Sequence, residues 1–278
     1  MATVGPPESA PNTGRPAQSR QPDRLLDLLT RDAEPDQLVA LHHSAAREPG
    51  YAPWPEWVDP QLRHGYEELG LAQLWQHQAA AAQSAWDGNP TIIATGTGSG
   101  KSVGVWLPTI SRIAAQHRAS QEQLGNIRAA AHHPTALYLS PTKALAHDQY
   151  ESLREVRRAG GLDWLQIATA DGDSSFETKQ WARSQAHIVL SNPDYLHFAL
   201  LPNSRRWNKF LRGLQYVIID ECHTLHGLLG SHVSAVLRRL RRLCRAAGSD
   251  PVFLFASATL AQPAEHAARL LNLTAAEV

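Results

Sequence analysis

One glycine-rich segment constrains the fold of this chain more than any other feature. The apolar, β-branched run Thr91-Ile92-Ile93-Ala94 precedes it, and an amphipathic stretch, residues 103–113, follows it. This order predicts a strand, a tight loop and a helix. Glycines let the loop turn sharply, and the helix adds unpaired N–H groups and the positive end of its dipole. The segment is therefore typical of a loop that binds a polyphosphate.

The loop also contains groups suited to the metal that accompanies a polyphosphate. Its residues are Thr95, Gly96, Thr97, Gly98, Ser99, Gly100, Lys101 and Ser102. Lys101 supplies a cation for the terminal phosphates, and the hydroxyl of Ser102 can bind magnesium. One position departs from the strict phosphate-loop pattern, which has glycine where this chain has Thr95.

Two other interpretations of the loop are open at this point. Gly100-Lys101-Ser102-Val103-Gly104 also matches the nucleophile elbow of hydrolases, which lies between a strand and a helix. That interpretation gives no role to Lys101 or to the glycines at 96 and 98. A flexible linker is the second alternative, but linkers do not usually connect a β-branched strand directly to a helix.

A second apolar run ends in two adjacent carboxylates. Tyr216-Val217-Ile218-Ile219 predicts a buried strand, and Asp220-Glu221-Cys222-His223 follows it. Charges at the end of a buried strand are costly unless they are paired or used in chemistry. Beside a phosphate-binding loop, Asp220 is suited to hold magnesium, and Glu221 to deprotonate an attacking water. The simpler alternative is that the strand merely ends in polar residues.

A zinc site is a further interpretation of the same region. Cys222, His223, His226 and His232 lie close together in the sequence. A structural zinc site usually has four ligands with paired spacing, and here a single cysteine belongs to a motif that is already explained. The pattern therefore favours the carboxylate motif over a metal cluster.

Strands and helices alternate along the chain, which predicts an α/β fold with a parallel sheet covered by helices on both faces. The expected strands lie near 91–95, 135–140, 165–169, 187–190, 216–220 and 252–256. The expected helices lie near 24–32, 73–87, 102–117, 143–158, 176–184, 231–247 and 263–271. The strand ends should gather the motifs along one edge, where such sheets bind ligands. Residues 118–134 have the weakest pattern and are expected to form a surface insertion.

Composition agrees with a globular protein of one or two domains, since 43% of the 278 residues are hydrophobic and 19% are charged. Residues 1–22 have neither periodicity nor a signal-peptide pattern, so we expect a disordered tail there. Residues 23–72 are expected to be a helical lead-in, and residues 73–278 the main domain. Two cysteines and no apolar run of bilayer length predict a reducing, cytoplasmic location without a membrane.

A formal net charge of zero gives no overall sign of nucleic-acid binding, which has to be argued locally. The arginines of residues 238–245 lie opposite an apolar helix face, which favours a solvated surface over a DNA groove. Better candidates follow predicted strand ends and can hold phosphates without reading sequence, namely Pro141, Thr142, Lys143, Ser191 and Asn192. Tryptophans are more typical of packing, with Trp75 and Trp207 nearest to these surfaces.

Together these motifs resemble those of superfamily 2 helicases of the DExH type. Gly96–Ser102, Asp220–His223 and Ser257–Thr259 are similar to motifs I, II and III, and Pro141–Ala146 and Ser191–Asp194 to motifs Ia and Ib. Over residues 38–272 the chain is most similar to the MrfA-like (YprA-like) DNA-repair helicases of bacteria. The resemblance implies a RecA-like P-loop NTPase domain that uses ATP and magnesium.

The resemblance also assigns roles to single residues. It implies that Lys101 and Glu221 are catalytic and that Ser102 and Asp220 hold magnesium. Gln78 lies where these helicases have an adenine-reading glutamine, and a glutamine amide can pair with adenine N6 and N7 at once. The expected nucleic acid is DNA, bound along a single-stranded track.

The resemblance further implies that His223, Ser257 and Thr259 couple the nucleotide site to the strand. Such helicases close ATP between two RecA-like domains, and the second domain supplies arginine fingers. No motif of this chain matches that second half. We therefore expect low ATPase activity from the chain alone and a C-terminal helicase half in cis or in trans. An RNA helicase, a double-strand translocase and a non-catalytic fragment that binds ATP and nucleic acid are alternatives.

Overall fold

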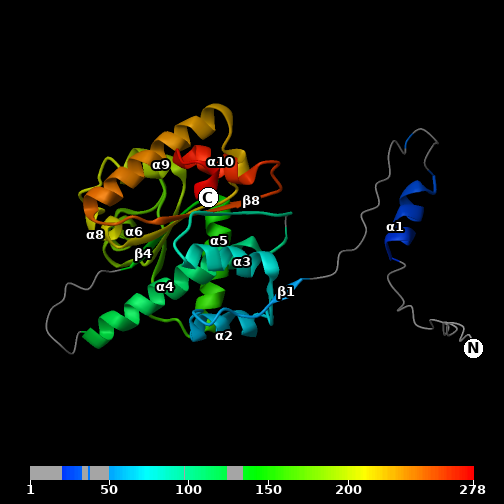
Figure 1. The fold of residues 1–278 in the computed structure, drawn as a ribbon, viewed down its shortest axis with the longest axis horizontal. Coiled ribbons are helices and arrows are strands. Elements are labelled where there is room, and N and C mark those ends of the chain that lie inside the picture. Colours follow the sequence, from blue (N-terminus) through cyan, green and yellow to red (C-terminus); the bar gives the residue numbers. More distant parts are fainter. Residues whose placement is uncertain (1–20, 33–36, 38–49, 97, 124–133) are drawn as a thin grey trace, which may run out of the picture. The chain divides into compact units, whose positions relative to one another are not determined.

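The computed structural model describes residues 21–32, 37, 50–96, 98–123 and 134–278 (Figure 1). The chain divides into two compact units, Met1–Glu48 and Pro49–Val278. In the first unit the structure describes helix α1 (Gln21–Thr30), which the sequence predicts near 24–32. The predicted tail, residues 1–22, lies outside the described residues except for its last two, which begin α1.

A parallel sheet of six strands forms the centre of the second unit (Figure 1). Its strands are β3 (Thr91–Ala94), β4 (Thr135–Leu139), β5 (Ile167–Thr169), β6 (Ile188–Ser191), β7 (Leu214–Ile219) and β8 (Val252–Ser257). Their order across the sheet is β3-β8-β7-β4-β6-β5, and every neighbouring pair is parallel. This sheet confirms the predicted fold class.

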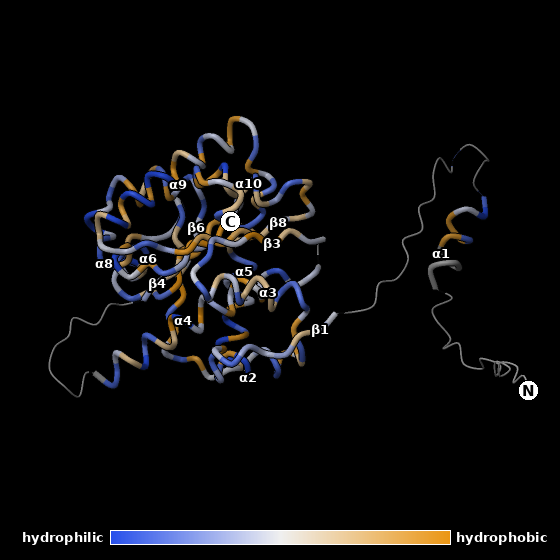
Figure 2. The backbone as a smooth tube through the Cα atoms, in the orientation of Figure 1, coloured by the Kyte–Doolittle hydropathy of each residue, from blue (hydrophilic) through white to orange (hydrophobic). Residues whose placement is uncertain are grey.

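Helices cover both faces of the sheet, which is why most strand residues on both faces are apolar. One face carries α2 (Pro60–Glu68), α3 (Gln76–Trp86), α4 (Lys101–Gln123) and α5 (Lys143–Ala159). The other carries α6 (Phe176–Gln185), α8 (Asn208–Arg212), α9 (Gly227–Ala247) and α10 (Pro263–Leu271). Figure 2 shows the hydrophobic strands between these two layers.

Successive side chains of one strand point to opposite faces of the sheet, so each strand contributes residues to both cores. On β7, Tyr216 and Ile218 enter the core beneath α4, whereas Val217 and Ile219 enter the core beneath α9. Because side chains alternate with period two, the next residue, Asp220, falls on the α4 face. Within the described part of the chain, no helix is both long and apolar enough to cross a membrane.

Helix α4 is longer than the sequence predicts. It continues to Gln123, so the first part of the expected insertion, residues 118–134, is helical. Residues 118–123 carry no apolar period, but a helix that is already formed extends readily through polar residues of good helix propensity. Residues 124–133 lie outside the described residues.

Residues 50–72 belong to the same compact unit as the sheet, although the sequence predicts them as a separate lead-in. The short strands β1 (Tyr51–Ala52) and β2 (Leu74–Trp75) pair antiparallel. Helix α2 crosses α5 so closely that a Cβ atom on Gly65 would lie 2.7 Å from the carbonyl oxygen of Val156. Residues 50–72 therefore pack onto the domain and are not an independent element.

Asp59 fixes the start of α2 from inside the domain. The residue is only 1% exposed, and its Oδ1 accepts hydrogen bonds from the N–H groups of Gln61 and Leu62 at 3.0 and 3.1 Å. Its other carboxylate oxygen pairs with Arg118 of α4, and its own N–H donates to Ser111 Oγ at 3.0 Å. One carboxylate thus caps α2 and ties it to α4.

We expect Asp59→Ala to lower the free energy of unfolding by about 2 kcal/mol, because it removes the cap and leaves Arg118 unpaired. Asp59→Asn retains a capping oxygen and should cost about half as much. Urea unfolding of both variants, followed by circular dichroism, measures the difference. Equal losses for alanine and asparagine would contradict the capping role.

Candidate nucleotide and nucleic-acid site

The carboxyl ends of the parallel strands meet at one edge of the sheet. The glycine-rich loop follows β3 and Asp220 follows β7, with β8 between these two strands. The N–H of Thr95 donates to the carbonyl of Ser257 at 3.3 Å, and the N–H of Asp220 donates to the carbonyl of Leu139 at 2.8 Å. The phosphate loop and the carboxylates are therefore brought to the same edge.

The glycine-rich loop turns where the sequence supplies glycine. Gly98 and Gly100 have φ values of 75° and 70°, a region that costs other residues about 1 kcal/mol. Lys101 is the first residue of α4, and its Nζ donates to the carbonyls of Thr95 and Gly96 at 3.1 and 3.0 Å. The ammonium thus lies against the loop backbone, where a terminal phosphate can reach it.

Thr95, which replaces the glycine of the strict pattern, closes the loop with its side chain. Its Oγ1 lies 2.6 Å from Ser99 Oγ. His77 of α3, which the sequence analysis did not single out, supports the same turn because its Nε2 lies 3.0 Å from the Ser99 carbonyl oxygen. Thr97, also predicted to contact the nucleotide, lies outside the described residues.

Gln78 is buried beneath the loop, and both ends of its amide are engaged. The residue is 1% exposed, its Oε1 accepts from the Trp75 N–H at 2.9 Å, and its Nε2 donates to the Gly100 carbonyl at 2.9 Å. Gln78 therefore supports the phosphate loop in this arrangement. Adenine recognition by Gln78 stays a prediction, and it requires the amide to release Gly100.

Two donors hold the carboxylate of Asp220. The hydroxyl of Tyr138 donates to Oδ2 at 2.5 Å, and the N–H of Glu221 donates to Oδ1 at 2.8 Å. Burial, with the charge of Asp220 as a smaller cause, raises the pKa of Tyr138 well above its usual range, so this hydroxyl stays protonated and donates. Each carboxylate oxygen retains a second lone pair for a cation.

The donor atoms at this edge fit magnesium. Mg²⁺ prefers oxygen ligands and is usually held by one or two protein oxygens together with phosphates and waters. The hydroxyl of Ser102 and the carboxylate of Asp220 provide oxygens of this kind. Among the described residues, no three His, Cys, Asp or Glu side chains form a group that could hold a metal ion. Burial also raises the pKa of the Cys222 thiol to about 12.

Glu221 has an unusual backbone conformation. Its φ and ψ are 49° and 38°, in the left-handed region, and its carbonyl accepts hydrogen bonds from the N–H and the hydroxyl of Thr224 at 3.0 and 2.8 Å. This conformation costs a residue with a side chain about 1 kcal/mol. Backbone strain of this kind often accompanies function, and here it falls on the residue predicted to be the base.

His223 connects Glu221 with the segment after β8. Its Nδ1 lies 3.1 Å from Glu221 Oε2 and 3.3 Å from the N–H of Ala258, so its protonation state decides which contact is a hydrogen bond. Ser257 is fully buried at the end of β8, and Thr259 is exposed. The arrangement therefore brings the three predicted coupling residues to one turn, although their coupling role stays a prediction.

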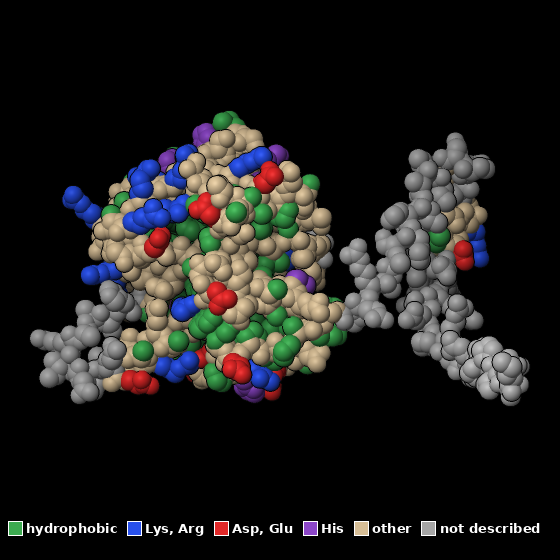
Figure 3. Space-filling view, viewed as in Figure 1, with side chains coloured by type: hydrophobic (Ala, Val, Ile, Leu, Met, Phe, Trp, Pro, Cys, Tyr) green, Lys and Arg blue, Asp and Glu red, His purple; other side chains and the backbone are tan. Residues whose placement is uncertain are grey.

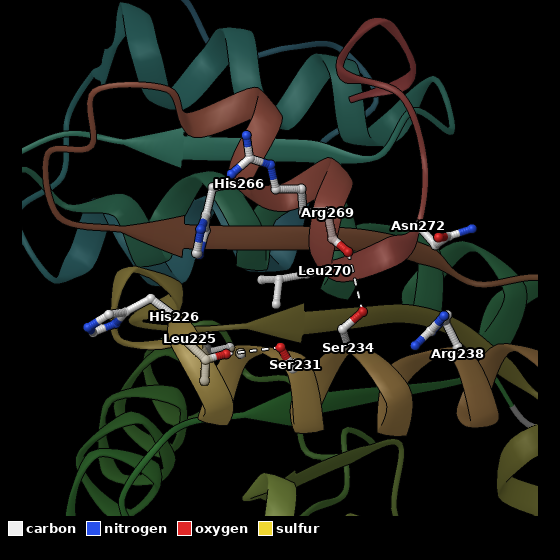
Figure 4. Close-up of a pocket in the computed structure, with 11 residues that line it drawn as sticks. Leu225, His226, Ser231, Ser234, Arg238, His266, Arg269, Leu270 and Asn272 are labelled. Atoms are coloured by element: carbon white, nitrogen blue, oxygen red, sulfur yellow. Dashed lines mark hydrogen bonds between the residues drawn. The ribbon is translucent and has the colours of Figure 1, made fainter.

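A polar pocket of about 390 Å³ lies between α9 and α10 beside this turn (Figure 4). The hydroxyl of Ser234 donates to the Arg269 carbonyl at 3.3 Å and joins the two helices. His266 of α10 lines the pocket, and its Nε2 lies 2.7 Å from the Cys222 carbonyl oxygen. His266 thus supports the carboxylate turn, a contact that no sequence motif indicates.

The structure disfavours the nucleophile elbow. Ser102 lies in the first turn of α4, and its hydroxyl accepts from Gln149 Nε2 at 3.3 Å rather than contacting a histidine. Gly104 has a packing role instead, because a Cβ atom there would lie 2.7 Å from the Ile93 side chain. The second glycine of the elbow pattern is thus explained by the close approach of α4 to β3.

The residues of motif Ia that are predicted to contact nucleic acid lie at the start of α5. Pro141 and Thr142 precede the helix, and Thr142 Oγ1 caps it by accepting from the Leu145 N–H at 3.3 Å. Lys143 is exposed, and its ammonium pairs with Asp173. This hydrogen bond raises the pKa of Lys143. A phosphate at Lys143 would therefore compete with Asp173.

The structure revises the expectation for Ser191. The residue is 2% exposed, and its hydroxyl donates to the Ala170 carbonyl at 2.5 Å, so its side chain does not face a bound nucleic-acid strand. The sequence predicts the end of the β-strand correctly but not the direction of the hydroxyl. Asn192 caps the short helix α7 (Pro193–Tyr195), its Oδ1 accepting from the Tyr195 N–H at 2.8 Å.

The two tryptophans near the candidate surfaces differ in burial. Trp207 is 1% exposed and packs against Phe210 with 5.5 Å between ring centroids, so it is a core residue. Trp75 is partly exposed and lies 4.9 Å from the ring of Tyr51. The apolar face of α9 is buried as predicted, and Figure 3 shows Lys and Arg side chains gathered over α8 and α9.

We expect substitutions of Glu221 to separate backbone strain from chemistry. Glu221→Asn should be as stable as the natural chain or more so, because asparagine tolerates the left-handed region. Glu221→Val should lower the free energy of unfolding by about 1–2 kcal/mol, because a β-branched residue does not. Both variants lose the carboxylate, so chemical denaturation compares the backbone effect alone. Equal stability of the two variants would contradict the strain.

Comparison with known proteins identifies relatives. Residues 75–267 match the DEAD/DEAH box helicase family. The uncharacterized ATP-dependent helicase YprA of Bacillus subtilis is 39% identical over 241 residues, which are 87% of this chain and 30% of YprA. The ATP-dependent helicase hrq1 of Schizosaccharomyces pombe is 30% identical over 254 residues, which are 90% of this chain and 22% of that protein.

A solved structure agrees with these matches. The crystal structure of the DUF1998 helicase MrfA bound to DNA and AMPPNP superposes with a TM-score of 0.74 at 39% identity, over 82% of this chain and 30% of MrfA. The chain thus spans less than a third of the length of each of these relatives. Because the family match covers most of the chain and includes every motif described above from Gln78 to Thr259, the chain belongs to the DEAD/DEAH box helicases.

Proposed function

We propose that this chain is the ATP-binding motor domain of an ATP-dependent DNA helicase. The observation that carries the proposal is the convergence of Lys101–Ser102, Asp220–Glu221 and Thr142–Lys143 at one edge of a parallel sheet. DNA is favoured over RNA because MrfA, a relative of 39% identity, was crystallised with DNA and AMPPNP. A role in DNA repair and a cytoplasmic location stay predictions.

The proposed chemistry follows from the contacts of the site. Lys101 exchanges the carbonyls of Thr95 and Gly96 for terminal phosphate oxygens, to which it offers a full charge. Magnesium held by Ser102 and Asp220 would neutralise charge on the phosphates. Glu221 accepts the proton of the attacking water. His223, 3.1 Å from the Glu221 carboxylate, orients that base.

The strand contacts are proposed to be Pro141, Thr142, Lys143 and Asn192, which hold backbone phosphates rather than bases. Ser191 contributes indirectly, because its hydroxyl fixes the loop after β5. Contacts of this kind do not distinguish sequences. They support a single-stranded track whose affinity depends on salt.

Hydrolysis at a useful rate requires a further cation opposite Lys101. We propose that a second RecA-like helicase half, in cis or in trans, supplies it, because arginine fingers contribute about 10³ to 10⁵ in turnover in well-studied NTPases. The chain alone should then bind ATP but hydrolyse it slowly. If added helicase halves never restore turnover, the alternative of a non-catalytic ATP-binding fragment is favoured.

Lys101→Ala tests the nucleotide site. We expect the affinity for ATP with magnesium to fall at least about tenfold, since one charge-assisted contact to phosphate is lost. Calorimetric titration measures this affinity, and thermal unfolding checks that the fold survives. The control is Lys179→Ala, which removes a half-buried lysine whose Nζ donates to the Gly172 carbonyl; this variant should bind as the natural chain does. ATP binding unchanged in Lys101→Ala would contradict the proposed function.

Asp173→Asn tests the strand site by freeing Lys143. We expect tighter binding of a labelled oligothymidine and a salt dependence steeper by about 0.7 in log–log slope, the increment for one single-strand phosphate. Asp163→Asn removes the same charge beyond the C-terminal end of α5 and controls for net charge. Fluorescence anisotropy across a salt series gives both quantities. The same response in both variants would show that Lys143 has no special part.

A further inference from the structure

A continuous set of side chains connects the two proposed magnesium ligands. The hydroxyl of Ser102 accepts from Gln149 Nε2 at 3.3 Å, and Gln149 Oε1 accepts from Trp106 Nε1 at 3.1 Å. The indole of Trp106 stacks on Tyr138, with 5.6 Å between ring centroids and 26° between planes. The hydroxyl of Tyr138 then donates to Asp220 Oδ2 at 2.5 Å.

These residues come from four elements that the core holds rigidly. Trp106 lies on α4, Tyr138 on β4 and Gln149 on α5, while Asp220 follows β7. Trp106 and Tyr138 are 2% and 1% exposed, so neither ring can move without repacking the core between the sheet and α4. The two rings are therefore fixed, and we call Trp106, Tyr138 and Gln149 the platform residues.

The hydrogen-bond directions within the platform are determined by chemistry. An indole N–H can only donate, so the Gln149 carbonyl oxygen has to face Trp106 and its NH₂ group has to face Ser102. An NH₂ group can only donate, so it uses one lone pair of the Ser102 oxygen and leaves the second. Tyr138 is a donor to Asp220 in the same sense. Both proposed metal ligands thus present oriented lone pairs.

We propose that the platform residues position the oxygens of Ser102 and Asp220 for a magnesium ion bound together with a nucleoside triphosphate. They are positioning residues, since they do not touch the nucleotide themselves. Partners that orient metal ligands in this way commonly change metal affinity by 10- to 100-fold when they are removed. This inference rests on the proposed function and extends it to residues outside the helicase motifs.

The test compares nucleotide affinity with and without the metal. AMPPNP is titrated calorimetrically into the full chain in excess EDTA and again in excess magnesium, and the ratio of the two affinities is the magnesium enhancement. Tyr138→Phe removes only the hydroxyl, and Gln149→Leu removes only the amide at similar size. We expect each to lower the enhancement about tenfold while the affinity in EDTA stays within about twofold.

Matched controls separate positioning from packing. Tyr216→Phe removes another buried hydroxyl, which donates to the Ala85 carbonyl at 3.3 Å, and Gln116→Leu removes another amide from α4, which donates to Gln215. Both controls should keep the natural enhancement. Mn²⁺ bound to the AMPPNP complex, followed by electron paramagnetic resonance, gives the same comparison by a spectroscopic signal.

The outcomes are distinguishable. Natural enhancement in both platform variants would overturn the inference while the proposed function stands. Equal losses of affinity with and without magnesium would also overturn it, because they indicate general damage to the loop. Failure of the natural chain to bind AMPPNP at all would overturn the proposed function and this inference with it. Because Gln149 is only partly buried, Gln149→Leu is expected to fold even if Tyr138→Phe does not.

Discussion

The register of the parallel strands β3, β8 and β7 is the constraint on which the whole site depends. Ile92 lies opposite Phe255, and Phe255 lies opposite Ile219, so these residues form one row across the sheet. All three face the core beneath α9. A slip of one residue would exchange the two faces of a strand and move every apolar side chain out of its core. The same slip would take Asp220 off the face that Tyr138 shares, so the packing of the core also fixes the chemistry.

The register also supports unusual backbone conformations at this edge of the sheet. Gly98, Gly100 and Glu221 all have positive φ, and all three lie just beyond strands that this row holds in place. Glycine relieves the cost at two of these positions, whereas the third is Glu221, the proposed base, where the strain stays. Unfavourable conformations of this kind persist when the surrounding structure determines them. Here the two buried cores hold the strands in place, and the loops that follow the strands carry the proposed nucleotide-binding groups.

The sequence predicts the six strands because each is a short apolar run buried on both faces, and it predicts the motif positions because each motif follows such a run. It does not predict side-chain direction beyond a strand end. Both Gln78 and Ser191 were expected to face ligands; in this arrangement the amide of Gln78 donates to the Gly100 carbonyl, and the hydroxyl of Ser191 donates to the Ala170 carbonyl. Tyr138 could have been found, since a hydroxyl in a buried strand needs a partner and Asp220 follows the neighbouring strand on the same face. The Lys143–Asp173 pair could not, because nothing in the spacing of residues 143 and 173 brings them together.

Helix α5 joins the two halves of the proposed site in one rigid element. Its first turn carries Lys143, proposed to contact the strand, and less than two turns later Gln149 donates to the Ser102 hydroxyl. A helix of this length moves as a unit, so a displacement of its start by a bound strand would also displace the amide at Ser102. Coupling between two sites is reciprocal. If a bound nucleic-acid strand changes the affinity for magnesium and nucleotide through α5, then magnesium and nucleotide change the affinity for that nucleic-acid strand by the same factor. Substitution of the platform residues should therefore reduce both of these effects together.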